Sequence, residues 1–265
     1  MKTFISFFLS ICIGALTAQN TDSLALKKIY DYYLSNSNCY NNLGYLCNKI
    51  GNRLSGSPQA ERAVAWAKKA MYEAGADTVI LQKCMVPHWV RGQKEKCELS
   101  SSVLKMKTPL NCLALGSSVG TGTSGIKAKV VEVKSYEEME KLGTANLKGK
   151  IVFYSASFNQ THIVTGHAYR DAVTYRVKGA SYAAKYGAVA CVIRSMSSLA
   201  DDEPHTGNMH YDTSISKTKV PALALSYKAA DVLHNALSKD ADLELYIESH
   251  CQMLPDVESF NVVGQ

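Results

Sequence analysis

The residues best able to do chemistry in this chain of 265 residues are its seven histidines. Two pairs stand close together in the sequence, His162 with His167 and His205 with His210. The members of each pair are five positions apart, whereas two metal ligands on one face of a helix need a separation of three or four. The spacing of the histidines therefore does not predict a helical zinc site.

A second arrangement contains residue types that bind zinc in proteins. It consists of His210-Tyr211-Asp212 and the acidic run Asp201–Glu203 a few residues before it. Histidine and carboxylate side chains are both zinc ligands. However, these residues lie in a polar stretch that contains Gly and Pro, and no buried strand leads into it. The surroundings favour a solvated loop over a metal site.

The segment Gly116–Gly120 matches the G-x-S-x-G pattern of serine hydrolases, with Ser118 in the place of the nucleophile. That serine lies on a sharp turn between a strand and a helix. Leu113–Leu115 could form the strand, but Thr121–Gly125 cannot begin a stable helix because it consists of Gly, Ser and Thr. Serine hydrolysis at Ser118 is therefore an alternative that the context disfavours, and the sequence contains no complete catalytic set.

The bulk composition indicates a globular protein with no affinity for nucleic acid. Hydrophobic residues make up 46% and charged residues 20% of the chain, which is long enough for one large domain or two modest ones. The formal net charge is +6, but the basic residues are scattered and do not alternate with aromatic residues. This distribution is typical of solvated surfaces.

Residues 1–18 have the pattern of a secretory signal peptide. Lys2 precedes the apolar run Phe4–Leu16, and Leu16-Thr17-Ala18 supplies small residues for cleavage. No later segment approaches the roughly 20 apolar residues of a membrane-spanning helix. We therefore expect a mature protein that is secreted, or periplasmic in a bacterium, and not bound to a membrane after cleavage.

Cysteine usage is compatible with export. Seven cysteines follow the signal peptide, and none forms a C-x-x-C pair, which argues against a zinc ribbon or a thioredoxin-type site. Export permits disulfides. Seven is an odd number, however, and the pairing cannot be deduced from the sequence.

The pattern of apolar residues predicts mixed helices and strands, with a change in character after residue 120. We predict helices over 22–34, 39–50, 57–74, about 173–184 and 227–237, and strands over 78–86, 128–133, 150–154, 188–193, 222–225, 243–247 and 259–264. Such a mixture indicates an α+β or barrel-like unit. The stretch Gly116–Gly125 is the predicted boundary, and the last strand has no visible partner in the chain.

Several segments, taken in order, resemble one family. Gly51–Pro58, the helix after it, Pro87–Gly92 and Leu115–Thr121 are similar to the N-terminal part of M28 zinc peptidases of the carboxypeptidase Q group. Later matches are Gly149–Val152, Tyr175–Arg176, Gly179–Ala180, Ala183–Ala188, Ile193–Ser195, Pro204–Gly207, Val220–Ala222 and Ser259–Asn261. Each match is weak alone, but together they cover most of residues 50–263.

The resemblance implies a layout and a cofactor. After the signal peptide, residues 19–117 would be the first part of an α/β zinc-peptidase domain, 118–250 an inserted, β-rich protease-associated (PA) domain, and 251–265 a return to the incomplete peptidase domain. Members of the family bind two zinc ions through His, Asp and Glu residues, and the metals activate a water molecule. Those residues would follow the return strand, so we expect no zinc or catalytic residue in this chain and no activity from it alone.

The resemblance also implies a carboxypeptidase- or dipeptidase-like exopeptidase that acts on small peptides, and it leaves open a homodimer. Arg194 and His205 lie in matching segments and are candidate substrate-binding residues, since an arginine fork can bind a peptide carboxylate. The competing interpretation of these two residues is structural ion pairing. The competing interpretation of the whole chain is a non-catalytic PA-domain module that binds peptides or protein partners.

Overall fold

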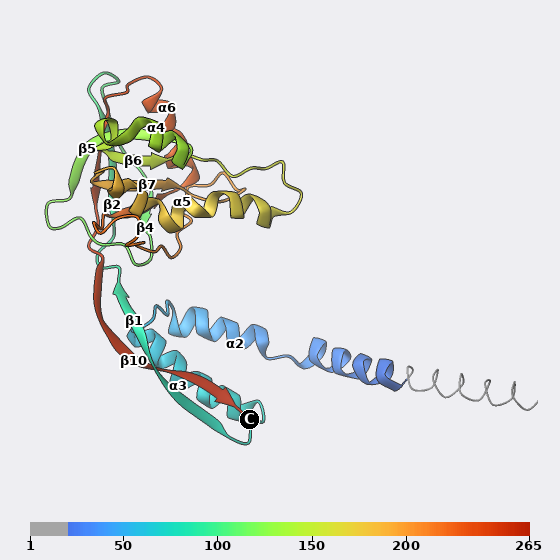
Figure 1. The fold of residues 1–265 in the computed structure, drawn as a ribbon. Coiled ribbons are helices and arrows are strands. Elements are labelled where there is room, and N and C mark those ends of the chain that lie inside the picture. Colours follow the sequence, from blue (N-terminus) through green and yellow to red (C-terminus); the bar gives the residue numbers. More distant parts are fainter. Residues whose placement is uncertain (1–20) are drawn as a thin grey trace, which may run out of the picture.

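The computed structural model describes residues 21–265, so the predicted signal peptide at 1–18 lies outside the described residues. Two sheets organise the chain: an eight-stranded mixed sheet and a separate two-stranded ribbon. Figure 1 shows the larger sheet with its helices at one end of the molecule and the ribbon at the other. The combination of helices and strands confirms the predicted mixed α/β class.

The eight-stranded sheet has the order β3-β2-β9-β5-β6-β7-β8-β4. Strands β5, β6, β7 and β8 run parallel to one another, and the remaining pairs are antiparallel. The strands are β2 (Lys96–Ser101), β3 (Met106–Pro109), β4 (Cys112–Ala114), β5 (Ile126–Val133), β6 (Ile151–Tyr154), β7 (Ala190–Arg194), β8 (Ala222–Leu225) and β9 (Glu244–Glu248).

Every residue of β6, β7 and β8 is buried, as expected for short apolar strands covered on both faces. Helix α6 (Tyr227–Leu237) covers one face, where Leu233 packs with Phe153 and Val192. Helices α4 (Tyr136–Leu147) and α5 (Thr165–Lys185) cover the other. The predicted bounds of β8 and α6 are confirmed. Helix α6 begins at Tyr227 because the preceding Ser226 caps it, accepting a hydrogen bond from the Ala229 N–H at 2.9 Å.

The ribbon consists of β1 (Val79–Val90) and β10 (Gln252–Gly264), paired antiparallel with a register shift at Pro87. The expectation that the last strand has no partner in the chain was therefore wrong. Its partner lies about 170 positions earlier, which no local pattern reveals. Helix α3 (Pro58–Glu73), capped by Ser57 as predicted, packs along the ribbon.

The N-terminal helices extend away from this ribbon in Figure 1. Residues 21–36 are helical, and α2 (Cys39–Tyr45) continues into a short π-helix, η1 (Leu46–Ile50), that ends at Gly51. These segments confirm the two predicted helices. Within residues 21–265, no helix is long and apolar enough to cross a membrane.

The glycine-rich stretch at 116–125 lies inside the unit built on the larger sheet. Strands β2, β3 and β4, at residues 96–114, pair into that sheet, although the sequence placed them in the first domain. Gly120 is needed for close approach, because a Cβ there would lie 2.8 Å from the Ser249 carbonyl oxygen. By strand pairing, the chain passes between ribbon and sheet at residues 91–95 and 249–251.

We expect hydrogen exchange to separate the two parts of the fold. None of the α3 residues is buried and most of β1 and β10 is exposed or half-buried, whereas β6, β7 and β8 are fully buried. Amides of the ribbon should therefore exchange about a hundredfold faster than those of β6–β8, because local opening needs less free energy where less apolar surface is buried. Equal protection in the two parts, measured by mass spectrometry, would contradict this.

Candidate functional site

A groove lies where the ribbon meets the larger sheet. It is formed by two adjacent pockets of about 400 and 710 Å³ that share Leu54 and Arg91 in their linings, and we call it the junction groove. The loop between η1 and α3 contributes Arg53 to one pocket, while β1 contributes Trp89 to the other. The loop before β8 supplies Thr206–Asn208. The groove is thus assembled from segments far apart in the sequence.

Arg91 is held firmly at the centre of the junction groove. One terminal nitrogen donates to Glu95 Oε1 at 2.9 Å and to the Ala114 carbonyl oxygen at 2.7 Å. Its guanidinium carbon lies 5.0 Å from the centre of the Trp89 ring, in cation–π geometry. Trp89 is buried and donates its indole N–H to the Ser118 carbonyl oxygen at 2.8 Å. Arg91 therefore keeps a fixed orientation while its side chain stays 27% exposed.

Glu95 is the buried charge that supports this arrangement. Its side chain is 1% exposed, and Oε1 accepts hydrogen bonds from Arg91 and from the Ala114 N–H at 2.9 Å. Its other oxygen, Oε2, is buried without a hydrogen-bond partner. Burial, and then the charge of Glu95, raise the pKa of the neighbouring Cys251 to about 11. Cys251 therefore stays a thiol at neutral pH.

The opposite wall of the groove is held by one side chain to backbone contact and one contact between side chains. Thr206 donates its hydroxyl to the Ala114 carbonyl oxygen at 2.9 Å, and Ser117 donates to Asn208 Oδ1 at 2.8 Å. Ser117 has a φ of 72°, an uncommon backbone conformation for a residue other than glycine. Ser117, Thr206 and Asn208 thus present polar groups to the groove from a fixed backbone.

A charged cluster surrounds Glu248, at the end of β9, where the chain passes from the sheet to the ribbon a second time at residues 249–251. Its carboxylate accepts hydrogen bonds from Tyr246 at 2.7 Å, from His250 at 3.0 Å and from Lys96 at 3.1 Å. These three contacts, in that order of size, lower the pKa of Glu248 to about 2. The cluster links β9 to β2.

We expect this cluster to make stability fall in acid. The Glu248 pKa is about 2 in the folded protein and about 4.3 in an unfolded chain, so the unfolded state takes up the proton first. The stabilisation is present above pH ~4.3 and is lost as the pH falls toward 2. Urea unfolding midpoints should decline over this window, and Glu248→Gln should reduce the decline. Glu258→Gln, at the exposed pair with Lys83, is the control that should leave it unchanged.

Of the two predicted substrate-binding residues, Arg194 is occupied by structural contacts. It is buried at the end of β7, where Nε donates to the Ser155 carbonyl oxygen at 3.1 Å and a terminal nitrogen donates to Asp231 at 2.6 Å. Its guanidinium carbon also lies 5.0 Å from the centre of the Tyr227 ring. This arrangement favours the ion-pairing interpretation of Arg194.

His205 has an exposed side chain in the loop that lines the groove. Its backbone N–H donates to Ser195 Oγ at 2.7 Å, so the loop is fixed to the residue after Arg194. Its ring centre lies 6.4 Å from that of Tyr169. His205 directly precedes Thr206, which reaches the groove, so substrate contact by His205 stays a prediction.

Ser118 has a structural role. It is 1% exposed, and its hydroxyl donates to the Val119 carbonyl oxygen and accepts from the Ala222 N–H, both at 2.9 Å. A nucleophilic serine must instead be exposed on a turn beside a histidine. Ser118 therefore joins the glycine-rich stretch to β8, and the serine hydrolase alternative gains no support.

The histidines do not converge on a metal site. Asp212 accepts hydrogen bonds from Ser214 and lies 3.4 Å from Lys178, and His210 is exposed. His162 pairs with Asp171 at 2.9 Å near the protein surface. Across residues 21–265, no group of three or more His, Cys, Asp or Glu side chains could hold a metal ion.

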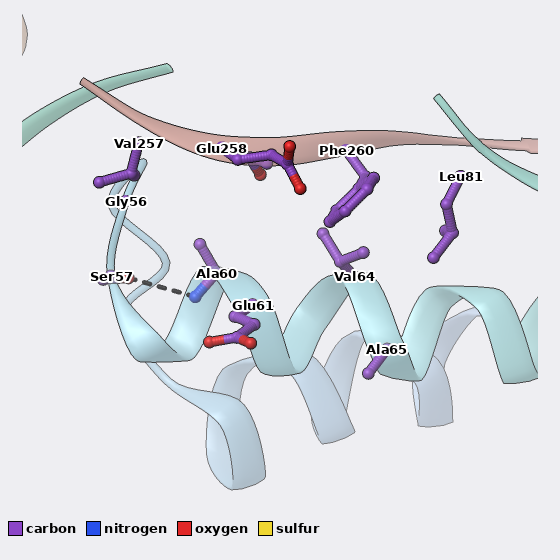
Figure 2. Close-up of a pocket in the computed structure, with 11 residues that line it drawn as sticks. Gly56, Ser57, Ala60, Glu61, Val64, Ala65, Leu81, Val257, Glu258 and Phe260 are labelled. Atoms are coloured by element: carbon purple, nitrogen blue, oxygen red, sulfur yellow. Dashed lines mark hydrogen bonds between the residues drawn. The ribbon is translucent and has the colours of Figure 1, made fainter. Parts of the chain in front are cut away.

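A further pocket, of about 520 Å³, separates α3 from the ribbon. Figure 2 shows Phe260 of β10 pointing toward Val64 of α3, with Leu81 of β1 beside them. Glu61 and Glu258 add carboxylates, but no catalytic partner accompanies them in the lining. The pocket is chiefly a gap in the packing of α3 on the ribbon, and we assign no chemistry to it.

Sequence reasoning did not single out Trp89, Arg91 and Glu95 as functional residues. Arg91 and Thr206 both bind the Ala114 carbonyl oxygen, although they are more than 100 residues apart in the chain. No short-range spacing carries that information. The similarity of Pro87–Gly92 to the peptidase family was the available signal, and it did not identify their contacts.

Comparison with known proteins shows that the chain is similar in sequence to a group of peptidases. Carboxypeptidase Q from mouse is 33% identical over 237 residues, which is 89% of this chain and 47% of the mouse protein. The human protein is 32% identical, with 91% of this chain and 48% of that protein covered. The chain therefore spans about half the length of the curated relatives it matches. No protein-family model matches the sequence.

Solved structures agree with this relationship. A peptidase M28 precursor from Shewanella amazonensis superimposes with a TM-score of 0.84 at 29% identity, over 92% of this chain and 54% of that one. The zinc aminopeptidase of Bacillus subtilis shares the fold with a TM-score of 0.52 at 19% identity, over 85% and 45% of the two chains. The chain is thus a homologue of carboxypeptidase Q, with the fold of M28 peptidases, over about half the length of that protein.

Proposed function

We propose that this chain is the N-terminal part of a secreted M28-type zinc exopeptidase that cleaves small peptides as a carboxypeptidase or dipeptidase. The observation that carries the proposal is the 33% identity to carboxypeptidase Q over 89% of the chain. The structural similarity to an M28 peptidase precursor, at a TM-score of 0.84, supports it. The signal-like residues 1–18 support export.

The two parts of the fold have different roles in this proposal. The ribbon and α3 are the first piece of the peptidase domain, and the unit built on the larger sheet is a PA-like lid. The range we propose for the lid is residues 96–249 instead of 118–250, and the pairing of β2, β3 and β4 into the larger sheet supports it. Peptide substrates bind in the junction groove, against Arg91, Thr206 and Asn208, with His205 at its edge. The predicted homodimer stays a prediction.

Zinc would enter this function through residues outside residues 21–265. The described histidines and carboxylates do not form a group that fits the ion. We therefore assign no catalytic step to the described residues. Their contribution is to bind and orient the peptide, since Arg91 is fixed by Glu95 and still partly exposed. A preorganised arginine fork suits a carboxylate group of a peptide.

A peptidase assay with metal removal tests the proposal. We expect the protein encoded by the natural reading frame, extended past Gln265, to hydrolyse dipeptides. A chelator should abolish at least 90% of the activity, and added zinc should restore it. Ser118→Ala, in a sample shown to be folded, should retain chelator-sensitive activity. Activity that survives the chelator and is lost in Ser118→Ala would instead support serine hydrolysis.

A further inference from the structure

Two of the cysteines, Cys97 and Cys112, lie side by side in the core. Cys97 is on β2 and Cys112 begins β4, and these strands stand near opposite ends of the eight-stranded order. The two edge strands of the sheet follow one another in the chain, since β3 ends at Pro109 and β4 begins at Cys112. The Leu110 N–H continues the β2–β3 pairing by donating to the Cys97 carbonyl oxygen at 2.9 Å, which brings Cys112 near Cys97. Both side chains belong to one apolar cluster with Leu99 and Leu225. The two thiols therefore lie where the sheet closes on itself.

The two thiols are neighbours in the core and are shielded from water. Cys97 is 4% exposed and Cys112 is 9% exposed, and Cys112 is the group that contributes most to the raised pKa of Cys97. The other buried cysteines lie elsewhere, Cys191 in the cluster on the opposite face of the sheet and Cys251 beside Trp89.

We propose that Cys97 and Cys112 form a disulfide when the chain folds in an oxidising compartment, and that the bond fastens the two ends of the curled sheet. The inference rests on the export that belongs to the proposed function, because disulfides persist outside the reducing cytosol. It assigns one pair among the seven cysteines that follow the signal-like residues.

The oxidation is a thiol–disulfide exchange with a small-molecule or protein disulfide as the oxidant. The thiolate of one cysteine attacks a sulfur of that disulfide, and the first thiolate leaves. The second cysteine then attacks the mixed disulfide, forms the Cys97–Cys112 bond and releases the second thiolate. The pair loses two electrons and two protons, and the oxidant becomes two thiols. No other reactant is required.

The folded state controls when this exchange can occur. The hydrogen bond from Cys112, and then burial, raise the pKa of Cys97 well above its usual value. The pair therefore holds few thiolates at neutral pH, and burial blocks contact with an oxidant. The bond must form before the core closes. Once formed, it is protected from reductants by the same burial.

The expected effect on stability is substantial. The bond closes a loop of about 15 residues, and restricting a loop of this length in the unfolded chain lowers the unfolded-to-folded ratio by about a hundredfold. Cys97→Ala or Cys112→Ala should remove the difference between oxidised and reduced protein. Cys191→Ala is the matched control, because Cys191 is equally buried but lies in the other cluster.

Refolding tests the pairing directly. The full chain is first unfolded and reduced. It is then refolded either with a mixture of oxidised and reduced glutathione or with dithiothreitol. Each sample is alkylated without further reduction, digested and analysed by mass spectrometry. We expect a Cys97–Cys112 linked peptide only after refolding with glutathione, a chain lighter by the mass of two hydrogen atoms, and the hundredfold change in urea unfolding. Alkylated Cys97 and Cys112, or links to other cysteines, would overturn the proposal. This mapping uses the unsubstituted chain and does not depend on folding of the variants.

The same mapping on protein recovered from cells separates this inference from the proposed function. Protein exported to the bacterial periplasm should carry the link, whereas protein retained in the cytosol by deletion of residues 1–18 should not. If the link forms during refolding but the full-length protein remains in the cytosol as a thiol form, the pairing stands and the export is refuted. Exported protein with both thiols free would refute the disulfide itself.

Discussion

Glu95→Ala should destabilise the protein by about 3 kcal/mol, since it leaves the buried Ala114 N–H and the partly buried Arg91 guanidinium without their acceptor. The Glu95 side chain is 1% exposed and accepts hydrogen bonds from Arg91 and from the Ala114 N–H. The truncation deprives both donors of their acceptor. Urea unfolding, followed by circular dichroism, measures the change. Glu95→Gln should lie between the native protein and Glu95→Ala, because its amide oxygen can still accept one hydrogen bond.

Glu98→Ala is the matched control on the same part of the chain. Glu98 pairs with Lys107 at 3.0 Å, but its side chain is 34% exposed. Surface ion pairs contribute at most about 1 kcal/mol. A loss at Glu98 equal to that at Glu95 would show that burial of the Arg91–Glu95 pair has no special weight. A native-like Glu95→Ala protein would contradict the account of the groove.

Gly92→Ala should be comparably damaging, with an expected loss of about 2–5 kcal/mol. Gly92 has a φ of 78°, which costs an L residue about 1–2 kcal/mol. A Cβ there would also lie 2.6 Å from the His250 carbonyl oxygen, so the two chain crossings would be forced apart. Overpacking of this kind costs a further 1–3 kcal/mol or so. Thermal and urea unfolding both measure the loss.

Gly122→Ala separates the two contributions. Gly122 has nearly the same φ, 77°, but no atom lies within 4 Å of the position that its Cβ would take. This variant should therefore lose only the backbone part, about 1–2 kcal/mol. Equal losses in the two variants would mean that close packing of Gly92 on His250 does not matter for joining the ribbon to the sheet.

Local signals predicted most of the helices and the central strands, but α4 was not predicted and α5 begins at Thr165, before the predicted start at about residue 173. Ser57 and Ser226 cap α3 and α6 at the predicted ends, and the apolar runs of β6 and β8 lie where expected. In these segments the cap residue and the apolar pattern agree with one another. Agreement between local preference and tertiary burial is what makes such elements predictable.

The remaining strands depend on long-range pairing. Strand β2 alternates buried and exposed positions over only six residues, several of them polar, so its apolar signal is weak. Strand β10 pairs with β1 in a register that sets Val79 opposite Gly264 and Val90 opposite Gln252. The residues near either strand do not specify the other strand as its partner. The glycines of residues 116–125 suggested a linker, but Gly120 is required where the chain crosses the backbone of Ser249. Close approach and flexibility produce the same sequence pattern.

The candidate site was the least predictable part. Arg194 was singled out for its chemistry, but Asp231 and the Ser155 carbonyl group occupy its donors. Arg91 instead reaches the groove, oriented by Glu95 four residues later and by Ala114 in another strand. A sequence shows which arginines exist, but their availability depends on contacts that only the fold determines.

The central claim is that this chain supplies the scaffold and lid of a zinc exopeptidase whose metal-binding residues follow it. The most direct measurement compares dipeptide hydrolysis and bound zinc in two purified proteins, the 265-residue chain and the product of the natural reading frame continued past Gln265. We predict that only the longer protein retains zinc after dialysis and hydrolyses dipeptides. Zinc-dependent hydrolysis by the 265-residue chain alone, or a stop codon directly after Gln265, would contradict the claim.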